Sequence, residues 1–291
     1  SEKAWKTPGS RMFNEVNQRG SVEELLKGMI IQSGHDASVA LAEHVAGSEE
    51  AFANLMNEHA RRLGMVNTHF INSTGLPDPE HYTTPHDIVL VTEATIREFP
   101  ELYKMYAVKE YTFNEIRQHN RNNLLWHDES VDGVKTGHTE AAGYCLVASA
   151  ERDGMRLVSV VMGTESEKAR IRESKSLLNY GFRFYETHRL YGASDRLTRS
   201  RVWMGEQEQV ALGLASDLYV TIPRHQYERL DARTVIQPQI EAPLVKGQKV
   251  GEVIVELDGE VLTRRALVAL DDVPEGGIWR TMVDSVLMML E

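Results

Sequence analysis

The feature that most restricts the fold is a pair of β-prone segments, residues 143–150 and 156–163, which follow each other across a tight turn. The Asp153-Gly154 pair between them is a strong signal for a β-hairpin. Shortly before the first segment stands Lys135-Thr136-Gly137. An ammonium beside a hydroxyl can bind a carboxylate, and a glycine lets a ligand lie against the backbone as an added strand would. The tripeptide therefore predicts a binding site on or beside a sheet edge, although three such residues also fit an ordinary solvated surface.

Helical periodicity dominates the chain before this hairpin. Ser21 and Glu24 form a capping box, and the apolar residues after them repeat at helical spacing, which predicts an amphipathic helix. This helix leads directly to Ser33-Gly34-His35, and a second, buried helix is predicted from Asp36 to Gly47. Ser33 and His35 therefore lie on a short connection between two core helices, where polar groups can be held rigidly at a cleft. Alternatively, Ser33 and Asp36 only cap the second helix.

Further helices are predicted on both sides of the hairpin. Ser48 caps one that runs to Leu63, and Thr84-Pro85 begins another with proline at its first position. A long helix over residues 165–185 follows the hairpin. Helices that precede and follow the sheet are typical of an α+β fold, or of an α/β fold with an antiparallel sheet, and not of repeated βαβ units.

The residue pattern of the sequence changes near residue 193. Residues 202–270 contain short β-rich runs separated by turns such as Asp258-Gly259, which predicts a second, all-β domain. We expect domains over 1–193 and 194–273, followed by an amphipathic helix within 274–291. The apolar line of this helix comprises Ile278, Met282, Val286 and Leu290. Such a helix either packs on the β domain or lies on a membrane surface, and the absence of lysine from its polar face favours packing.

Composition excludes several classes of function. The net charge of −11 and the lack of a long Lys/Arg run exclude nucleic acid as a partner. Cys145 is the only cysteine, so an internal disulfide and a cysteine-based metal cluster are excluded, and an inert thiol in the core is expected. The eleven histidines form no His-Glu-x-x-His, and no phosphate-binding glycine loop occurs, so neither a metal nor a cofactor is predicted. No signal peptide opens the chain and no apolar run is long enough for a membrane span, which fits a cytoplasmic protein as well as a mature or trimmed one.

Ser33-x-His35 and Lys135-Thr136-Gly137 occur in the order of the second and third motifs of penicillin-binding proteins. The surrounding sequence resembles the low-molecular-mass penicillin-binding proteins of the 5/6 group, which are D-alanyl-D-alanine carboxypeptidases. This resemblance extends from end to end of the chain, over IIQSGHDASVALAEHVAGSEEAF, VDGVKTGHTEAAGY, WKTPGSRMF, YTFNEIRQHNRNNLLW, SLLNYGFRFYE, VTIPR and PEGGIWRTMVDSVLMML. It implies a transpeptidase-like α/β domain, a small β domain, and a C-terminal helix on the surface of the inner membrane in the periplasm. The membrane surface thereby becomes the expected partner of the helix.

The resemblance also implies an activity and a set of site residues. The enzyme would remove the terminal D-alanine from peptidoglycan stem peptides that end in D-Ala-D-Ala, through an acyl-enzyme, and would be acylated by β-lactams. Ser33 would relay a proton to the leaving D-alanine, and Lys135 would keep the site electropositive and bind the substrate carboxylate. The expected substrate-binding residues are His35, Thr136, Gly137, His138 and Arg170. Arg170 follows from the resemblance alone, since its own surroundings indicate a surface charge.

The sequence departs from the family in two places. His35 stands where the family has asparagine, and an imidazole cannot offer a donor and an acceptor from one compact planar group. No lysine has a serine three residues before it, so the Ser-x-x-Lys motif of the acylated serine does not occur. We expect this motif in a segment upstream of residue 1, as in a trimmed chain. The alternatives are a non-catalytic protein that binds cell-wall peptide or a protein partner, and a site completed by a separate N-terminal piece.

Overall fold

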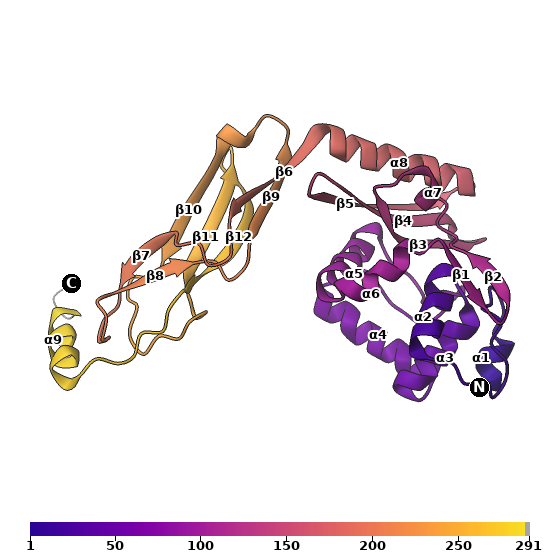
Figure 1. The fold of residues 1–291 in the computed structure, drawn as a ribbon, viewed down its shortest axis with the longest axis horizontal. Coiled ribbons are helices and arrows are strands. Elements are labelled where there is room, and N and C mark those ends of the chain that lie inside the picture. Colours follow the sequence, from indigo (N-terminus) through magenta and orange to yellow (C-terminus); the bar gives the residue numbers. More distant parts are fainter. Residues whose placement is uncertain (289–291) are drawn as a thin grey trace. The chain divides into compact units, whose positions relative to one another are not determined.

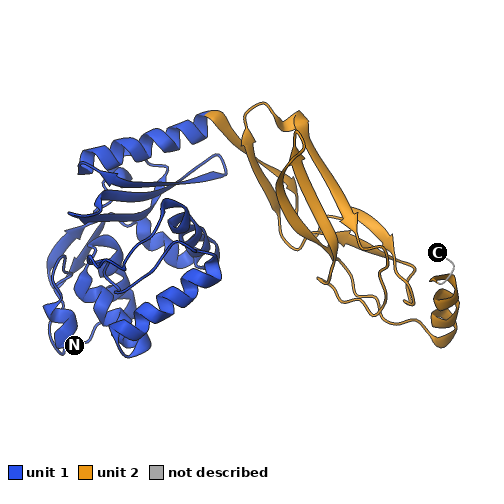
Figure 2. Cartoon of the chain, turned by 180° about the vertical axis from the view of Figure 1, so that it is seen from behind, with its two compact units in different colours: residues 1–183 blue, residues 184–291 orange. Residues whose placement is uncertain are grey.

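A computed structural model describes residues 1–288 of the chain, which forms two compact units, Ser1–Arg183 and Phe184–Glu291 (Figures 1 and 2). The first unit combines helices with an antiparallel sheet and the second consists mainly of strands, which confirms the predicted fold class. The structure moves the boundary expected between residues 193 and 194 toward the N-terminus. Strand β6 (Tyr185–Tyr191) pairs with β9 (Leu218–Pro223), so residues 185–191 belong to the second unit.

The first unit opens with a group of helices whose ends follow the predicted signals. These are α1 (Glu2–Lys6), α2 (Val22–Ile31), α3 (His35–Ala46), α4 (Glu49–Leu63), α5 (Pro85–Glu98), α6 (Pro100–Tyr103) and the 3₁₀ turn η1 (Lys104–Ala107). Ser21 caps α2 with both bonds of the capping box, and Thr84 caps α5. Ser48 caps α4, which ends at Gly64, where a φ of 79° requires the left-handed conformation that glycine adopts readily. Each of these ends is decided by residues close to it in the sequence.

A three-stranded antiparallel sheet follows, in the order β3 (Val131–Thr139), β4 (Gly143–Arg152) and β5 (Met155–Thr164). Asp153 and Gly154 form the predicted two-residue turn between β4 and β5, with positive φ values of 51° and 76° that match the twist of the strands. Among the described residues β3 pairs only with β4, so its other side is a sheet edge. Helix α8 (Glu167–Phe184) covers one face of the sheet, and the helical group lies on the other (Figure 1).

Two small elements connect the helices to this sheet. One is the antiparallel hairpin of β1 (Glu110–Phe113) and β2 (Ile116–His119). A loop at 120–123 and the short helix α7 (Leu124–His127) then lead into β3. The buried side chains of Leu124 and Leu125 anchor α7 in the core, which places the polar loop beside the edge strand.

The second unit contains the predicted all-β domain. A five-stranded sheet has the order β10 (Leu230–Ile236), β11 (Lys249–Leu257), β12 (Glu260–Ala269), β8 (Gln209–Gly213) and β7 (Thr198–Arg201), and a two-stranded sheet pairs β6 with β9. The 3₁₀ turn η2 (Tyr227–Arg229) precedes β10. Alternating aliphatic residues from both sheets fill one core, among them Leu212, Leu218, Ile222, Val255 and Leu267.

Helix α9 (Ile278–Met288) follows the β domain and confirms the predicted tail helix up to Met288. Leu290, the last member of its predicted apolar line, lies outside the described residues. Within residues 1–288 no helix is long and apolar enough to cross a bilayer.

Candidate active site

The site begins at the connection between α2 and α3. The amide of Gly34 donates to the carbonyl of Gly28 at 3.0 Å, and the amide of His35 donates to the carbonyl of Ser10 at 2.8 Å. Ser33 directly precedes these two residues and has a φ of 63°, in the left-handed region that residues other than glycine seldom adopt. Such local strain persists only where the surrounding structure enforces it, and it is concentrated at functional sites. The connection is therefore a rigid support for the Ser33 hydroxyl.

Asp36 has a structural role that differs from the expected helix cap. The N-cap of α3 is Gly34, which has no side chain to cap the helix, and Asp36 Oδ1 accepts from the first-turn amide of Ala37 at 2.9 Å. The Asp36 carboxylate is 1% exposed and accepts hydrogen bonds from the amides of Met12 at 2.9 Å and Asn14 at 3.1 Å. No bond joins Ser33 to a first-turn amide of α3, so the alternative interpretation of Ser33 as a cap is wrong, whereas Asp36 does bond to one such amide.

Lys135 brings the third motif onto the Ser33 hydroxyl. Its Nζ, on the edge strand β3, donates to Ser33 Oγ and, at 3.1 Å, to the carbonyl of Thr136. Burial lowers the pKa of Lys135 to about 8, and repulsion from Arg121 and Arg170 adds to this effect. No carboxylate among the described residues forms an ion pair with Lys135. An unpaired ammonium in a group of cations is a site for an anionic ligand.

Arg170 lies next to Lys135 and is almost entirely buried. The side chain comes from α8, and the residue is 4% exposed. Its Nη1 donates to the carbonyl of Gly137 at 3.2 Å, and its Nη2 lies 3.3 Å from a carboxylate oxygen of Glu167. Its Nε has no hydrogen-bond partner among residues 1–288. A buried guanidinium with an unused donor can bind a carboxylate at the end of β3.

His138 and Tyr144 continue the site along β3 and β4. The two residues are paired across the strands, and their rings contact each other with centroids 4.0 Å apart and planes tilted by 32°. The Arg170 guanidinium lies over the Tyr144 ring at 5.6 Å from its centroid. Gly137 and His138 are both exposed, so the edge of β3 is open to a ligand at this point. Thr136, the remaining residue predicted here, lies between Lys135 and Gly137 and is partly exposed.

Cys145 pairs with Gly137 across the two strands and is partly exposed, not buried in the core as the sequence predicts. It alternates with buried Leu146 along β4, so its side chain points to the less protected face of the sheet.

The ring of His35, another predicted site residue, is bonded to the N-terminal segment of the chain. Its Nδ1 lies 2.7 Å from the carbonyl oxygen of Pro8, which can only accept, so the neutral ring carries its proton on Nδ1. The ring packs so closely against Gly9 that a Cβ at this position would clash with its Nδ1. In the neutral ring Nε2 is then only an acceptor.

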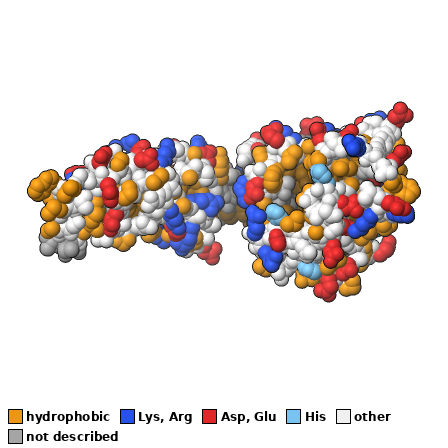
Figure 3. All heavy atoms as spheres, turned by 90° about the horizontal axis from the view of Figure 1, so that it is seen from below, with side chains coloured by type: hydrophobic (Ala, Val, Ile, Leu, Met, Phe, Trp, Pro, Cys, Tyr) orange, Lys and Arg blue, Asp and Glu red, His pale blue; other side chains and the backbone are white. Residues whose placement is uncertain are grey.

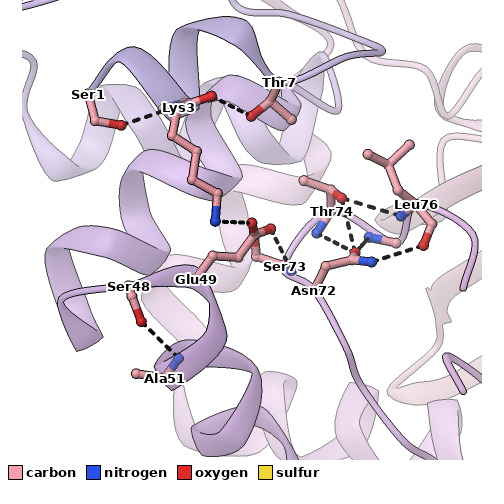
Figure 4. Close-up of polar contacts among 12 residues, drawn as sticks. Ser1, Lys3, Thr7, Ser48, Glu49, Ala51, Asn72, Ser73, Thr74 and Leu76 are labelled. Atoms are coloured by element: carbon pink, nitrogen blue, oxygen red, sulfur yellow. Dashed lines mark hydrogen bonds and ion pairs between the residues drawn. The ribbon is translucent and has the colours of Figure 1, made fainter.

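The segment that holds His35 is itself fastened by a network around Glu49 (Figure 4). Lys3 Nζ lies 2.9 Å from one Glu49 oxygen, and the other oxygen accepts from the hydroxyl of Ser73 at 2.9 Å and from its amide at 3.2 Å. Although burial opposes ionisation, these bonds lower the pKa of Glu49. A hollow of about 460 Å³ opens beside this network, lined by Lys3, Lys6, Thr7, Pro8, Glu49, Asn72, Thr74 and Leu76.

Arg121 is a site residue that sequence reasoning missed. It lies in the loop at 120–123, contributes to the low pKa of Lys135, and lines a hollow of about 390 Å³ together with Gln32 and Glu167. The only sequence signal was a run of polar residues, which predicts a loop but gives no spatial neighbour. Within residues 1–288 no cluster of three His, Cys, Asp or Glu side chains could hold a metal ion.

Comparison with known proteins gives consistent matches for both units. Residues 1–166 match the D-alanyl-D-alanine carboxypeptidase family, and residues 185–275 match the C-terminal domain of penicillin-binding protein 5. The D-alanyl-D-alanine carboxypeptidase DacC of Escherichia coli is 45% identical over 98% of this chain and 73% of its own. The structure of penicillin-binding protein 5 from Haemophilus influenzae covers 94% of this chain and 81% of its own, with a TM-score of 0.84 and 42% identity. Penicillin-binding protein D2 of Listeria monocytogenes, solved in an ampicillin-bound form, covers 57% of this chain and 70% of its own, with a TM-score of 0.53 and 30% identity.

The two units and the meeting of the Ser33 and Lys135 motifs define the class of low-molecular-mass penicillin-binding proteins. Within that class, the chain belongs to the family of D-alanyl-D-alanine carboxypeptidases.

Proposed function

We propose that this protein is a serine-type carboxypeptidase that removes the terminal D-alanine from peptidoglycan stem peptides ending in D-Ala-D-Ala, and that β-lactams acylate it. The observation that carries the proposal is the contact between Lys135 Nζ and Ser33 Oγ beside an open strand edge. The substrate adds along β3 with its terminal carboxylate toward Lys135, Thr136 and Arg170. Because peptidoglycan lies outside the inner membrane, the protein acts in the periplasm.

The contact also defines the direction of proton transfer. A hydroxyl carries one proton and two lone pairs, and the Lys135 ammonium already donates to Ser33 Oγ. The Ser33 proton is therefore free to pass to the amine of the leaving D-alanine when the peptide bond breaks, and the proton released by the acylated serine replaces it on Ser33. In the acyl-enzyme, the carbonyl carbon of the remaining D-alanine is bonded to a serine oxygen, and water then releases the shortened peptide. Ser33 serves here in proton transfer, and the acylated serine belongs to the Ser-x-x-Lys motif that these 291 residues do not contain.

Two measurements test this function. Calorimetry with residues 1–291 should detect binding of a peptide that ends in D-Ala-D-Ala. The same peptide with an amidated C-terminus should bind much more weakly. Protein purified from its native source should gain the mass of one benzylpenicillin and release D-alanine. Peptide binding with neither adduct nor product would instead support the non-catalytic binding protein, and absence of binding would refute both.

The low pKa of Lys135 gives ligand binding a characteristic pH dependence. A carboxylate binds the protonated ammonium, so affinity should be full near neutral pH and should fall as the pH rises through about 8. The fall should approach about tenfold per pH unit, because one proton is lost. A lysine of ordinary pKa would keep its charge to about pH 10. Calorimetry of the peptide across this range checks the prediction, which a flat profile up to about pH 10 would contradict.

Replacing His35 by asparagine should strengthen peptide binding. Asparagine offers a donor and an acceptor on one planar group, whereas neutral His35 offers only the Nε2 acceptor once Nδ1 is bonded to Pro8. One added hydrogen bond corresponds to about a two- to tenfold gain in affinity. Calorimetry of His35→Asn and His35→Gln would separate a specific gain from a general effect of losing the ring. Equal or weaker affinity of His35→Asn would show that the imidazole is the better partner.

The face that α9 exposes supports attachment of the protein to a membrane surface. Asp284 is 2% exposed and accepts from the amide of Met204 at 2.7 Å and from Arg280 Nε at 3.0 Å, so the polar side of the helix contacts the β domain. Trp279, Met282 and Val286 are 80%, 58% and 60% exposed on the other side. Figure 3 shows hydrophobic side chains gathered at this end of the second unit. The apolar face does not pack on the described part of the β domain, and a lipid surface is the partner that fits it.

A further inference from the structure

The loop Asn120-Arg121-Asn122 contacts both halves of the site, although neither predicted motif includes it. The amide of Arg121 donates to the carbonyl of Ile31 at 3.2 Å, and its Nε donates to the carbonyl of Gln32 at 2.8 Å. These two carbonyls immediately precede Ser33. The loop is thereby bonded to the strained connection that carries the serine hydroxyl.

The two asparagines bind the same loop to the sheet side of the site. Asn122 is 1% exposed, and its Nδ2 donates at 3.0 Å to the carbonyl of Gly133, on the strand that carries Lys135. Asn120 is 3% exposed, and its Nδ2 donates to the carbonyls of Tyr106 and Val108 at 3.2 and 3.0 Å. Its Oδ1 accepts from the amide of Asn122 at 2.9 Å. A buried polar network whose members are all bonded is rigid, so Arg121 is presented from a fixed frame.

Charge adds to this geometry. The Ser33 hydroxyl, on the α2–α3 connection, contacts the Lys135 ammonium. Arg121 from the loop and Arg170 from α8 both repel this ammonium, and the carboxylate of Glu167 pairs with Arg170. Arg121 is exposed and its guanidinium donates to a carbonyl, so no carboxylate partner among the described residues neutralises it. Removal of its charge would therefore change the field at Lys135 without leaving a buried group unpaired.

We propose that Asn120-Arg121-Asn122 is the positioning element of the site, in which Arg121 holds the Ser33 connection against the Lys135 strand and repels the Lys135 ammonium. The loop contributes no reacting atom in this role. The inference rests on the proposed function only for what the site binds, because the spacing of Ser33 and Lys135 can be measured without substrate.

The test compares Arg121→Gln with Arg121→Lys in the chain of residues 1–291. Competitive labelling of amines with acetic anhydride at a series of pH values, read by mass spectrometry, gives the titration midpoint of Lys135. For Arg121→Gln we expect a higher midpoint than for the unmodified chain, because one neighbouring cation is lost. For Arg121→Lys, which keeps the cation, we expect the original midpoint.

Amide hydrogen exchange at Gly34 reports the bracing role. The Gly34 amide donates a hydrogen bond to the carbonyl of Gly28 across the connection. When the connection opens, this amide is exposed to solvent and can exchange. Both variants lose the bond from Arg121 Nε to Gln32 in its original geometry, and exchange should be about two- to tenfold faster. The matched control is Arg117→Gln, which removes a cation that lines the same hollow but pairs with Glu110, and it should change neither readout.

The inference is overturned if Arg121→Gln lowers only the melting temperature and leaves both readouts unchanged, or if Arg117→Gln shifts them equally. A protein that binds no D-Ala-D-Ala peptide yet shows the predicted shifts would refute the proposed function and leave the positioning role intact. Unshifted readouts in a protein that binds the peptide would refute the positioning role and leave the proposed function intact.

Discussion

Lys135→Met is expected to remove most of the affinity for peptides that end in a free carboxylate. The ammonium is the one unpaired cation of the described site that touches the Ser33 hydroxyl. Loss of a hydrogen bond to a charged group costs about 1.5–3 kcal/mol, which makes the dissociation constant roughly ten- to a hundredfold larger. The rate of D-alanine release should fall further, by about two to four orders of magnitude, since proton transfer through Ser33 also loses its partner.

The same substitution should not destabilise the fold, which separates its effect from unfolding. The folded protein lowers the pKa of Lys135, so the unfolded chain binds this proton more tightly between about pH 8 and the ordinary lysine value. The charged ammonium therefore opposes folding below about pH 8, and its replacement by methionine should keep or raise the melting temperature at neutral pH. Lys168→Met is the control, because Lys168 is exposed on α8 and should alter neither binding nor stability. A marked loss of stability in Lys135→Met would contradict this account of the ammonium.

The second large effect is expected for α9. Replacing Trp279, Met282 and Val286 by serine should weaken binding to phosphatidylcholine vesicles by about a hundredfold, because roughly 3 kcal/mol of apolar burial is lost. Co-sedimentation with vesicles measures the change. The substituted side chains are exposed in the structure, so the folded β domain should keep its melting temperature.

A matched control separates the helix from general apolarity. Val235, Val245 and Val261 are 46%, 62% and 44% exposed elsewhere in the second unit, and their replacement by serine should leave vesicle binding unchanged. Equal vesicle binding by the α9 variant and the unmodified protein would rule out the helix as the attachment point.

Local sequence signals predicted many of the elements because their physics is local. The capping box of Ser21, the cap of Thr84 and the turn at Asp153-Gly154 each depend on hydrogen bonds or backbone conformations within a few residues. The same reasoning predicted Lys135 on or beside a sheet edge before the hairpin, and it lies on the edge strand β3. It could not place the loop of Arg121 beside the site, because a polar loop gives no information about its neighbours in space.

The sequence indicated which residues belong to the site and on which element they lie, but it did not indicate how their side chains are oriented. For His35, the sequence did not indicate that Nδ1 of its ring bonds to Pro8 of the N-terminal segment. Arg170 resembles a surface charge in its sequence, yet it is 4% exposed because α8 packs against the sheet. The domain boundary was misplaced for the same reason, since β6 joins the second unit through pairing with a strand that follows it in the sequence.

The sequence by itself determined the order of the motifs, the two kinds of domain and the amphipathic character of α9, because these follow from residue type and spacing. Tertiary structure alone decided that Ser33 and Lys135, which are 102 positions apart, would meet, and that the polar side of α9 would face the protein. Periodicity defines the faces of a helix, but the partner available to each face decides which one is buried. Asp284 found a backbone donor in the β domain, the amide of Met204, and an arginine donor, Arg280, on its own helix, and the apolar side was left exposed.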